Sequence, residues 1–310
     1  MRLRRVLLRC GMGYLLCNTI LAVILTEVAF RPQRLPLRFP ALAQATAARF
    51  DANLKDVAVT APDGVRLSGW FARPAKSNGN AVILLHGVAD NREGMGGFGA
   101  LFLSHGYSVL LPDSRAHGLS GGSFPTYGFK EASDVRAWYD WLDDYDRPSC
   151  VFGMGESMGA AIVLQALETA PFCAVVAESP FASFRQIAYI RVGQVFHTGS
   201  WLGKSALRPA IELALIYARL TRGVDLTSES PEQSVAATHV PVLLIHGLAD
   251  DNIPPRQSEM LRARNPVSVA LWEVPKAGHC GASSTVPAEF NSRVIFWFGL
   301  HRHADDPAVL

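Results

Sequence analysis

A serine, an aspartate and a histidine, far apart in the chain, each come shortly after an apolar run. Ser157 lies in GMGESMG behind CVF, Asp250 lies in HGLADDNIP, and His279 lies in AGHC behind VALWEV. A serine hydroxyl is a weak nucleophile unless a base takes its proton, and a histidine oriented by a carboxylate is such a base. Together these residue types could attack a carbonyl carbon and form an acyl-enzyme.

Ser157 is the centre of a G-x-S-x-G pattern with Gly155 and Gly159. The pattern alone is a weak signal, and a plain glycine-rich turn is the alternative interpretation. Its context strengthens it, because a buried strand must turn sharply into a helix here, which lifts the serine above the sheet. We expect both glycines to leave room for the close approach of helix and strand, where a larger side chain would clash.

Six unbroken aliphatic runs predict strands that are buried on both faces of a sheet. They are residues 81–87, 108–113, 150–155, 174–179, 241–247 and 269–274. An antiparallel hairpin over 57–74, turning at Pro62-Asp63-Gly64, precedes them. Segments with helical spacing lie between most runs, at 97–104, 129–143, 158–169 and 256–264. The alternation predicts an α/β fold with a mostly parallel, doubly wound sheet of eight strands.

The interval 181–239 contains no strand-like run and carries apolar residues at helical spacing. It predicts a helical cap, inserted between two strands and placed over their C-terminal ends, where ligands bind in open α/β sheets. We expect most of its large apolar side chains to form the core of the cap and others to line an acyl pocket. They are Phe181, Phe184, Ile187, Tyr189, Ile190, Val195, Phe196, Trp201, Leu202, Leu213, Ile216 and Tyr217.

The order serine, acid, histidine at three strand ends makes residues 55–300 resemble the α/β-hydrolase family. This resemblance implies that Ser157 is the nucleophile and that His279 is the general base, which later protonates the leaving group. It implies that Asp250 fixes the imidazole tautomer. The family segment H-G-x-x-D-x-x-[VI]-P is matched from His246 to Pro254.

Two other acids compete with Asp250. Asp251 is adjacent to it, and Glu178 ends a predicted strand. The family pattern favours Asp250, and a capping carboxylate is the preferred interpretation of Glu178. The resemblance also implies an oxyanion hole formed by the backbone N–H groups of Met158 and Val88.

Other polar residues near the strand ends are expected to be structural. His86 and His246 each precede a glycine and fit a scaffold role. PDSRAHGLSGG resembles the family's D-x-R-G-x-G-x-S loop, with Ala116 in place of a glycine, and Asp113, Arg115 and His117 should stabilise that loop. We predict no metal and no cofactor, because the remaining histidines lack ligand spacing and the chain has no phosphate-binding glycine motif.

The N-terminal segment is basic and apolar. Residues 1–40 hold seven arginines and one acidic residue, which leaves 22 basic and 26 acidic side chains in the remainder. The mildly acidic body argues against a nucleic-acid partner. Residues 10–30 have no basic residue and are long enough to span a bilayer. We predict an anchor and linker over 1–40 and a catalytic domain over 41–310.

The arginines before this apolar run favour a single-pass anchor with the catalytic domain on the extracytoplasmic side. A cleaved signal peptide ending near Ala41-Leu42-Ala43, or a soluble helix, are the alternatives. Arginines and prolines at 31–40 separate that site from the apolar run, which disfavours cleavage. The cysteines leave the compartment open: Cys150, Cys173 and Cys280 form an odd set in the body, and we expect buried thiols.

The favoured activity is hydrolysis of a carboxylic ester or thioester through an acyl-enzyme, because an alkoxide leaves more readily than an amine. The apolar cap and the anchor favour a hydrophobic, lipid-like acyl substrate. A serine aminopeptidase-like peptide or amide hydrolase is the alternative, which acidic residues in the cap would favour. A non-catalytic, membrane-tethered binding protein is a third hypothesis. The sequence does not predict the oligomeric state.

Overall fold

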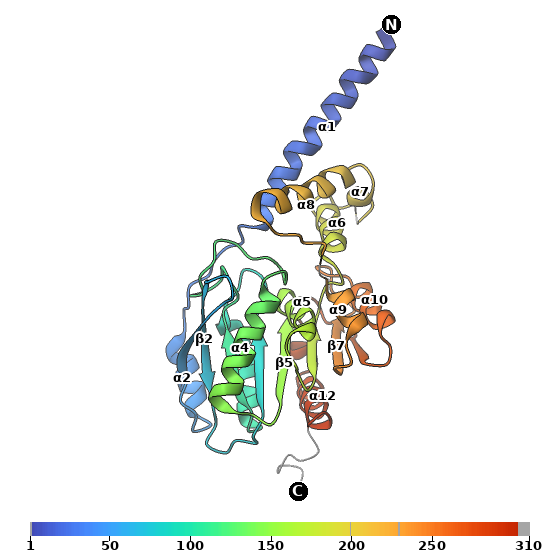
Figure 1. Cartoon of the computed structure of the whole chain (residues 1–310). Coiled ribbons are helices and arrows are strands. Elements are labelled where there is room, and N and C mark those ends of the chain that lie inside the picture. Colours follow the sequence, from blue (N-terminus) through green and yellow to red (C-terminus); the bar gives the residue numbers. More distant parts are fainter. Residues whose placement is uncertain (1, 199, 229, 303–310) are drawn as a thin grey trace.

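One sheet of eight strands organises the computed structural model, which describes residues 2–198, 200–228 and 230–302 (Figure 1). The order across the sheet is β1-β2-β4-β3-β5-β6-β7-β8. The strands are β1 (Lys55–Thr60), β2 (Arg66–Ala72), β3 (Ala81–Leu85), β4 (Ser108–Pro112), β5 (Val151–Glu156), β6 (Val175–Glu178), β7 (Val242–Gly247) and β8 (Val269–Val274). Strand β2 is antiparallel to both neighbours, and all other pairs are parallel. The predicted α/β fold is confirmed.

Helices follow most strands and cover both faces of the sheet. They are α1 (Arg2–Ala29), α2 (Pro40–Ala48), η1 (Arg92–Met95), α3 (Gly96–Ser104), α4 (Glu131–Asp146), α5 (Met158–Gln165), η2 (Ala166–Glu168), α6 (Phe184–Val195), α7 (Trp201–Lys204), α8 (Arg208–Arg222), α9 (Pro231–Ala237), α10 (Arg256–Arg264), α11 (Ala282–Thr285) and α12 (Pro287–Leu300). The predicted helix at 158–169 is split, because its last turn is a 3-10 helix.

Two apolar layers sandwich the sheet, since successive side chains of a strand point to opposite faces. On β3, Ile83 belongs to the layer with Trp138 of α4, whereas Val82 and Leu84 belong to the layer with Phe298 of α12. All five residues are almost fully buried. The central strands therefore form a rigid base from which the loops at their C-terminal ends project.

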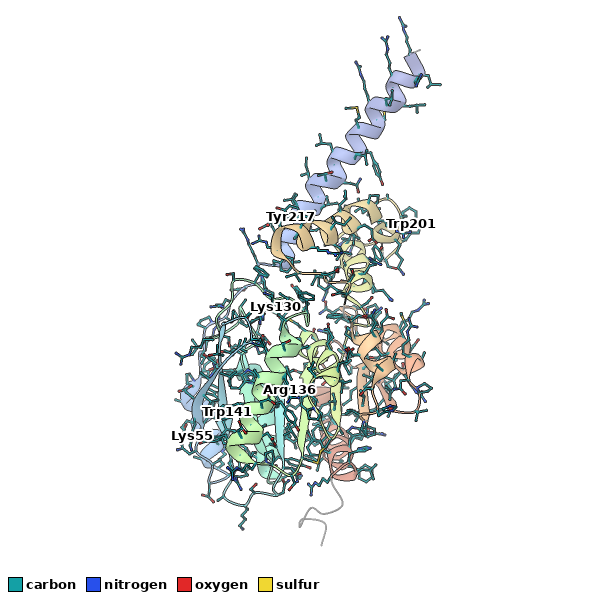
Figure 2. The ribbon with its side chains drawn as sticks, viewed as in Figure 1. Lys55, Lys130, Arg136, Trp141, Trp201 and Tyr217 are labelled. Carbon is teal, nitrogen blue, oxygen red and sulfur yellow. A yellow bond between two sulfur atoms is a disulfide. The ribbon has the colours of Figure 1, made fainter. Side chains whose placement is uncertain are left out.

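Strand β1 forms one edge of the sheet, and α4 contacts it. Lys55 of β1 donates a hydrogen bond to the Tyr145 hydroxyl, and the Tyr145 ring stacks on Trp141. Lys55 and Trp141 both lie at this edge, far from the cap (Figure 2). Strand β1 is thus a largely exposed edge strand, and a side-chain hydrogen bond joins its first residue to α4.

Helices α6, α7 and α8 stand beyond the C-terminal ends of the strands, together with the end of α1 (Figure 1). Helix α9, in the same predicted interval, instead contacts α5 and α10 beside the sheet. Ser183 begins α6 as its N-cap, Pro209 lies in the first turn of α8, and Gly223 ends α8 in a left-handed conformation. Local sequence signals therefore set the limits of the two main cap helices.

Helix α1 docks along α8 through polar groups. The Tyr14 hydroxyl donates to the carbonyl of Ala206 at 2.7 Å, and the Asn18 side-chain oxygen accepts the N–H of Ala210 at 3.0 Å. Further along, the Thr26 hydroxyl lies 3.1 Å from the carbonyl oxygen of Ala214. These bonds join residues nearly 200 positions apart, so α1 is a structural part of the cap.

The segment after α1 is fixed to the body rather than left as a free tether. The Arg34 guanidinium donates to the carbonyl oxygens of Ala116 at 3.0 Å and Ser120 at 2.8 Å. The Glu93 carboxylate accepts the backbone N–H groups of Arg38 and Phe39. The position of α1 relative to the sheet is therefore set at both ends of this segment.

The expectation of buried thiols is wrong for two cysteines of the body. Cys150 and Cys173, which precede the neighbouring strands β5 and β6, form a disulfide with their Cα atoms 5.8 Å apart. Strand pairing places them within bridging distance, which chain spacing alone does not reveal. Cys280 is a free thiol and is half-buried.

Candidate active site

Ser157 lies on a sharp turn between β5 and α5. Its backbone has φ +52° and ψ −112°, a conformation that L-residues adopt only where the surroundings hold it. A Cβ at Gly155 would lie 2.3 Å from the carbonyl oxygen of Gly159, and one at Gly159 would lie 2.1 Å from that of Leu85. Both glycines are therefore required by close backbone contacts, as the sequence predicts.

The imidazole of His279 lies between Ser157 and Asp250. Its Nε2 is 2.9 Å from the Ser157 Oγ, and its Nδ1 is 2.8 Å from the Asp250 Oδ2. The loops after β5, β7 and β8 supply the three residues. The predicted nucleophile, base and acid thus meet in one hydrogen-bonded chain that could move a proton away from the serine hydroxyl.

Asp250 is buried and is held as an anion. Burial by itself would raise the pKa of Asp250, but hydrogen bonds from His246, His279 and the backbone N–H of Ile253 outweigh it and lower that pKa below its usual range. The Oδ1 atom accepts the N–H groups of Asn252 and Ile253 at 2.9 and 2.8 Å. The carboxylate is therefore rigid and faces Nδ1 of His279 with negative charge.

The two competing acids do not contact the imidazole through any hydrogen bond in the described residues. Glu178 Oε1 accepts the N–H of Ala282 at 2.9 Å, and burial, partly offset by this bond, raises the pKa of Glu178 to about 7. Asp251 is exposed, and its carbonyl accepts a bond from Gln194 of α6. Glu178 therefore has the capping contact that the sequence suggests.

The predicted oxyanion-hole residues both line the cavity beside Ser157. Met158 is the first residue of α5, where a backbone N–H has no acceptor within the helix. Val88 follows Gly87, and a Cβ on Gly87 would lie 3.6 Å from the Ser157 Cβ. The loop that carries Val88 is therefore close to the serine, as two converging N–H donors would require.

His86 and His246 have structural partners. The His86 Nε2 accepts the N–H of Ser114, and burial, with the neighbouring His117, lowers the pKa of His86 to about 4, so that it stays neutral. His246 contacts the Ser258 hydroxyl and the Ile253 carbonyl at 2.7 and 2.8 Å. Both histidines hold loops of the site in place.

The loop over 112–122 is stabilised by buried ion pairs. Asp113 accepts a bond from Arg92 at 2.7 Å, and Arg115 lies 2.6 Å from Asp134. Ala116 replaces the family glycine and has φ +61°, a left-handed conformation that favours glycine. The loop keeps its turn despite the alanine because these pairs fix it on both sides.

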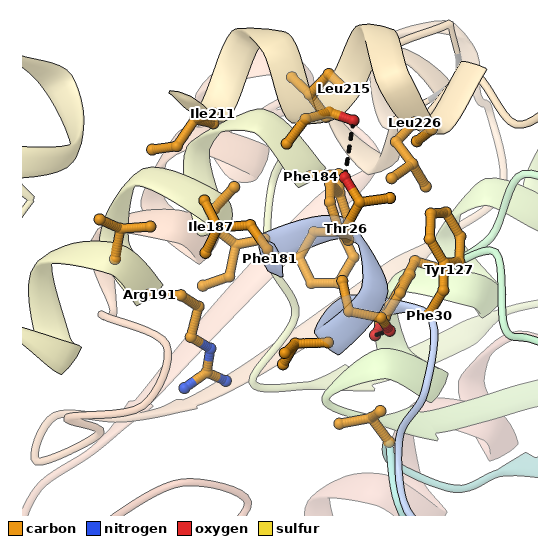
Figure 3. A pocket seen from close by; sticks show the side chains of 18 of the residues that line it. Thr26, Phe30, Tyr127, Phe181, Phe184, Ile187, Arg191, Ile211, Leu215 and Leu226 are labelled. Carbon is orange, nitrogen blue, oxygen red and sulfur yellow. Dashed lines mark hydrogen bonds between the residues drawn. The ribbon is translucent and has the colours of Figure 1, made fainter. Parts of the chain in front are cut away.

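An apolar cavity of about 400 Å³ lies between Ser157 and the cap (Figure 3). Among the side chains that line it in the described part of the chain, only Arg191 is charged, and none carries a carboxylate. Phe181, Phe184 and Ile187, predicted to lie in the cap core or a pocket, form one wall. Arg191 extends from α6 away from the aromatic side chains (Figure 3). The cavity suits a hydrocarbon chain next to a reactive carbonyl.

Sequence reasoning missed a second wall of this cavity, which comes from the N-terminal helix. Leu25, Thr26, Val28, Ala29 and Phe30 all line it. Figure 3 shows Thr26 bonded to α8 and Phe30 close to Tyr127. A signal existed, because residues 14, 18, 22 and 26 are polar or small at a spacing of four, which marks one face of a helix for contact with protein.

The fold and the relay together define an α/β enzyme with a serine at a strand-to-helix turn. The chain belongs to the alpha/beta hydrolase family, whose profile matches residues 82–293. It is therefore a hydrolase, as the sequence resemblance predicts.

Several relatives and solved structures are similar to the chain. The uncharacterised protein YqkD of Bacillus subtilis is 31% identical over 70% of each chain. An uncharacterised protein of Mycobacterium tuberculosis is 33% identical over 73% of this chain and 72% of its own. The esterase Pf2001 of Pyrococcus furiosus is 28% identical, with a TM-score of 0.70 over 88% of this chain and 98% of its own.

Proposed function

We propose that this hydrolase cleaves a carboxylic ester or thioester of a hydrophobic acyl group through a covalent acyl-enzyme. The observation that carries the proposal is the chain of hydrogen bonds from Asp250 through His279 to Ser157, at the edge of an apolar cavity. The likeness to the Pyrococcus furiosus esterase supports the ester as the bond that is cleaved.

In the proposed mechanism, His279 Nε2 takes the proton of Ser157 as its Oγ attacks the acyl carbonyl carbon. The backbone N–H groups of Met158 and Val88 stabilise the oxyanion. Asp250 holds the Nδ1–H tautomer and stabilises the imidazolium. The imidazolium then protonates the leaving alkoxide or thiolate, and water attacks the acyl-enzyme by the same proton route.

The lining of the cavity favours an acyl ester over a peptide. A substrate with a free ammonium group needs a carboxylate to bind it, and no lining residue in the described ranges has one. The carboxylate of Glu212, an acid of the cap, accepts a hydrogen bond from the Tyr189 hydroxyl and lies 3.5 Å from the Arg185 guanidinium. We therefore prefer the esterase to the aminopeptidase-like alternative.

We also propose that α1 is retained as a membrane anchor and that the catalytic domain lies outside the cytoplasm. Helix α1 is the one helix among the described residues with the length and apolarity to cross a bilayer, although a signal sequence meets the same criterion. Its docking to α8 argues against cleavage, which would remove a wall of the cavity. The Cys150–Cys173 disulfide fits an oxidising compartment.

The test is hydrolysis of p-nitrophenyl esters with acyl chains of 2 to 16 carbons by the full chain in detergent, compared with Ser157→Ala. We expect Ser157→Ala to lower kcat about 10⁴-fold or more, and Asp250→Asn to lower it by a smaller but large factor. Both variants should keep the thermal stability of the wild type within a few degrees.

Matched controls separate loss of chemistry from loss of fold. Ser284→Ala changes an exposed serine near His279 and should leave kcat unchanged. Full activity of Ser157→Ala would refute the nucleophile. A higher kcat/KM with amino-acyl p-nitroanilides than with every ester would instead support the peptidase alternative.

A further inference from the structure

The part of α1 that does not contact the cap is too short to cross a bilayer by itself. Contacts with the cap begin at Tyr14, and the helix before it, from Arg2, extends only about 18 Å at 1.5 Å per residue. The hydrocarbon core of a bilayer is about 30 Å thick. If α1 spans the membrane, residues after Tyr14 must also lie at hydrocarbon depth. Helix α8 contacts these residues and must then lie at the same depth.

The exposed face of docked α1 suits that depth. Leu16, Ile20, Ile24 and Val28 repeat every four residues and are 61%, 53%, 52% and 69% exposed. This stripe points away from the buried face of Asn18, Ala22 and Thr26, which contacts protein. From Leu16 to Ile24 the helix therefore has an apolar face that the described residues leave exposed, along the same length that contacts α8.

The outer face of the cap continues this apolar surface. Ile216 and Leu220 of α8 are 53% and 79% exposed, and Trp201 of α7 is 68% exposed. Tyr217 and Trp201 lie at the end of the molecule from which α1 projects (Figure 2). Exposed Lys204 and Arg208 flank this face, and Arg219, whose side chain is 71% exposed, lies between Ile216 and Leu220 in sequence. Aromatic and basic side chains around an apolar face are typical of surfaces that rest in the membrane interface.

Three apolar residues that line the cavity are also exposed at the surface. Val28 of α1 and Val195 of α6 are 69% and 73% exposed in the cap region, and Val88, in the loop beside Ser157, is 38% exposed. Ile187 and Leu215, further in, are buried. Two of these exposed residues belong to α1 and α6, and apart from Arg191 and the hydroxyls of Thr26 and Tyr127 the walls between them and Ser157 are apolar.

We propose that α1 and the outer face of α7 and α8 form one surface embedded in the bilayer, through which an acyl lipid passes from the membrane into the cavity. This rests on the proposed esterase function for the chemistry and on the proposed anchoring by α1 for the membrane contact. The occupant of the surface is the lipid bilayer, because the face is continuous with the spanning helix. The substrate class is a long-chain acyl ester dissolved in that bilayer.

The first test uses the full chain in phosphatidylcholine vesicles and needs no activity. Brominated acyl chains quench a tryptophan that they touch, and the difference between wild type and Trp201→Phe isolates the emission of Trp201. We expect brominated lipid to quench this share by half or more. If it quenches Trp201 no more than it quenches the body, as measured on the Trp201→Phe variant, the outer face lies in water and the proposal is overturned.

The second test compares two substrates in the same vesicles: 4-methylumbelliferyl palmitate, which dissolves in the bilayer, and water-soluble p-nitrophenyl acetate. Ile216→Glu combined with Leu220→Glu should lower palmitate hydrolysis at least fivefold and leave acetate hydrolysis within twofold. Neither residue lines the cavity. Equal loss on both substrates, or no loss on either, would contradict entry from the bilayer.

A matched control places the same charges on exposed apolar residues of the body. Val267 and Phe296 are 94% and 68% exposed and lie outside the cap. Val267→Glu combined with Phe296→Glu should leave both rates within twofold. A wild type that hydrolyses neither substrate would refute the esterase proposal, while Trp201 quenching would still decide whether the surface lies in the bilayer.

Discussion

At the residue scale, Glu156 stands next to the proposed nucleophile and is mostly buried. Burial first, and then the carboxylates of Glu178 and Asp90, raise the pKa of Glu156 to about 8 from its ordinary value of 4.5. Between these values the folded chain holds a proton that the unfolded chain releases. Folding is therefore penalised increasingly as the pH rises from 4.5 through 8.

Glu156→Gln keeps the shape of the protonated acid and removes this penalty. We expect wild type and variant to have nearly equal free energies of unfolding at pH 4.5, and the variant to be more stable by about 4 to 5 kcal/mol at pH 8.5. Urea unfolding at several pH values measures both. Glu168→Gln, at an exposed position, is the control and should follow wild type. A pH-independent difference between Glu156→Gln and wild type would rule out the proton linkage.

The residues of the relay could be predicted because each follows a recognisable strand in a fixed order. The spacing of a family segment selects Asp250 over Asp251 as the acid, and His279 is hydrogen-bonded to Asp250 in the structure. The catalytic roles themselves stay a prediction. The spacing of Asn18, Ala22 and Thr26 marks the face of α1 that contacts protein, but it does not reveal that this protein is the cap, so the cavity wall formed by Thr26 could not be placed from sequence.

At the element scale, the disulfide joins the starts of β5 and β6 across 23 positions in sequence. Closing such a loop in the unfolded chain typically stabilises the folded state by about 3 kcal/mol. Cys150→Ala combined with Cys173→Ala should therefore lower the melting temperature by several degrees without changing kcat, since the bridge is at the opposite end of β5 from Ser157.

Reductant provides an independent measure of the same bridge. Wild type should lose stability in dithiothreitol, whereas the double variant should not respond to it. Cys280→Ala is the matched control and should leave the melting temperature within about a degree. Equal melting temperatures of wild type with and without reductant, with the thiols shown to be free by labelling, would show that the bridge contributes no stability.

The strands could be located from sequence to within two residues, because buried parallel strands are unbroken aliphatic runs. The contacts between elements could not be predicted in this way. The contact of Cys150 with Cys173 depends on strand order, and the contact of α1 with α8 depends on where the cap stands. Neither order nor placement is encoded in local periodicity, so both appear only in three dimensions.

At the scale of the whole molecule, α1, the cap and residues at the ends of the sheet strands line one cavity (Figure 3). The sheet supplies the relay, α6 and α8 supply one apolar wall, and α1 supplies the other. An anchor that only tethered the enzyme could be removed without effect on selectivity. If the proposed acyl chain binds against α1, removal of α1 should change selectivity, because each methylene buried against it would contribute about 0.8 kcal/mol.

Two truncations distinguish these roles. A chain that begins at Gly11 loses only turns of α1 before the first cap contact, and it should keep the acyl-chain preference of the wild type. A chain that begins at Arg31 loses Leu25 and Phe30 from the wall, and its kcat/KM for p-nitrophenyl dodecanoate should fall about tenfold more than for the acetate, as expected when about two methylenes lose contact. Both are measured in detergent micelles below substrate saturation. A uniform fall on both esters would mean that α1 supports the fold but does not touch the acyl chain.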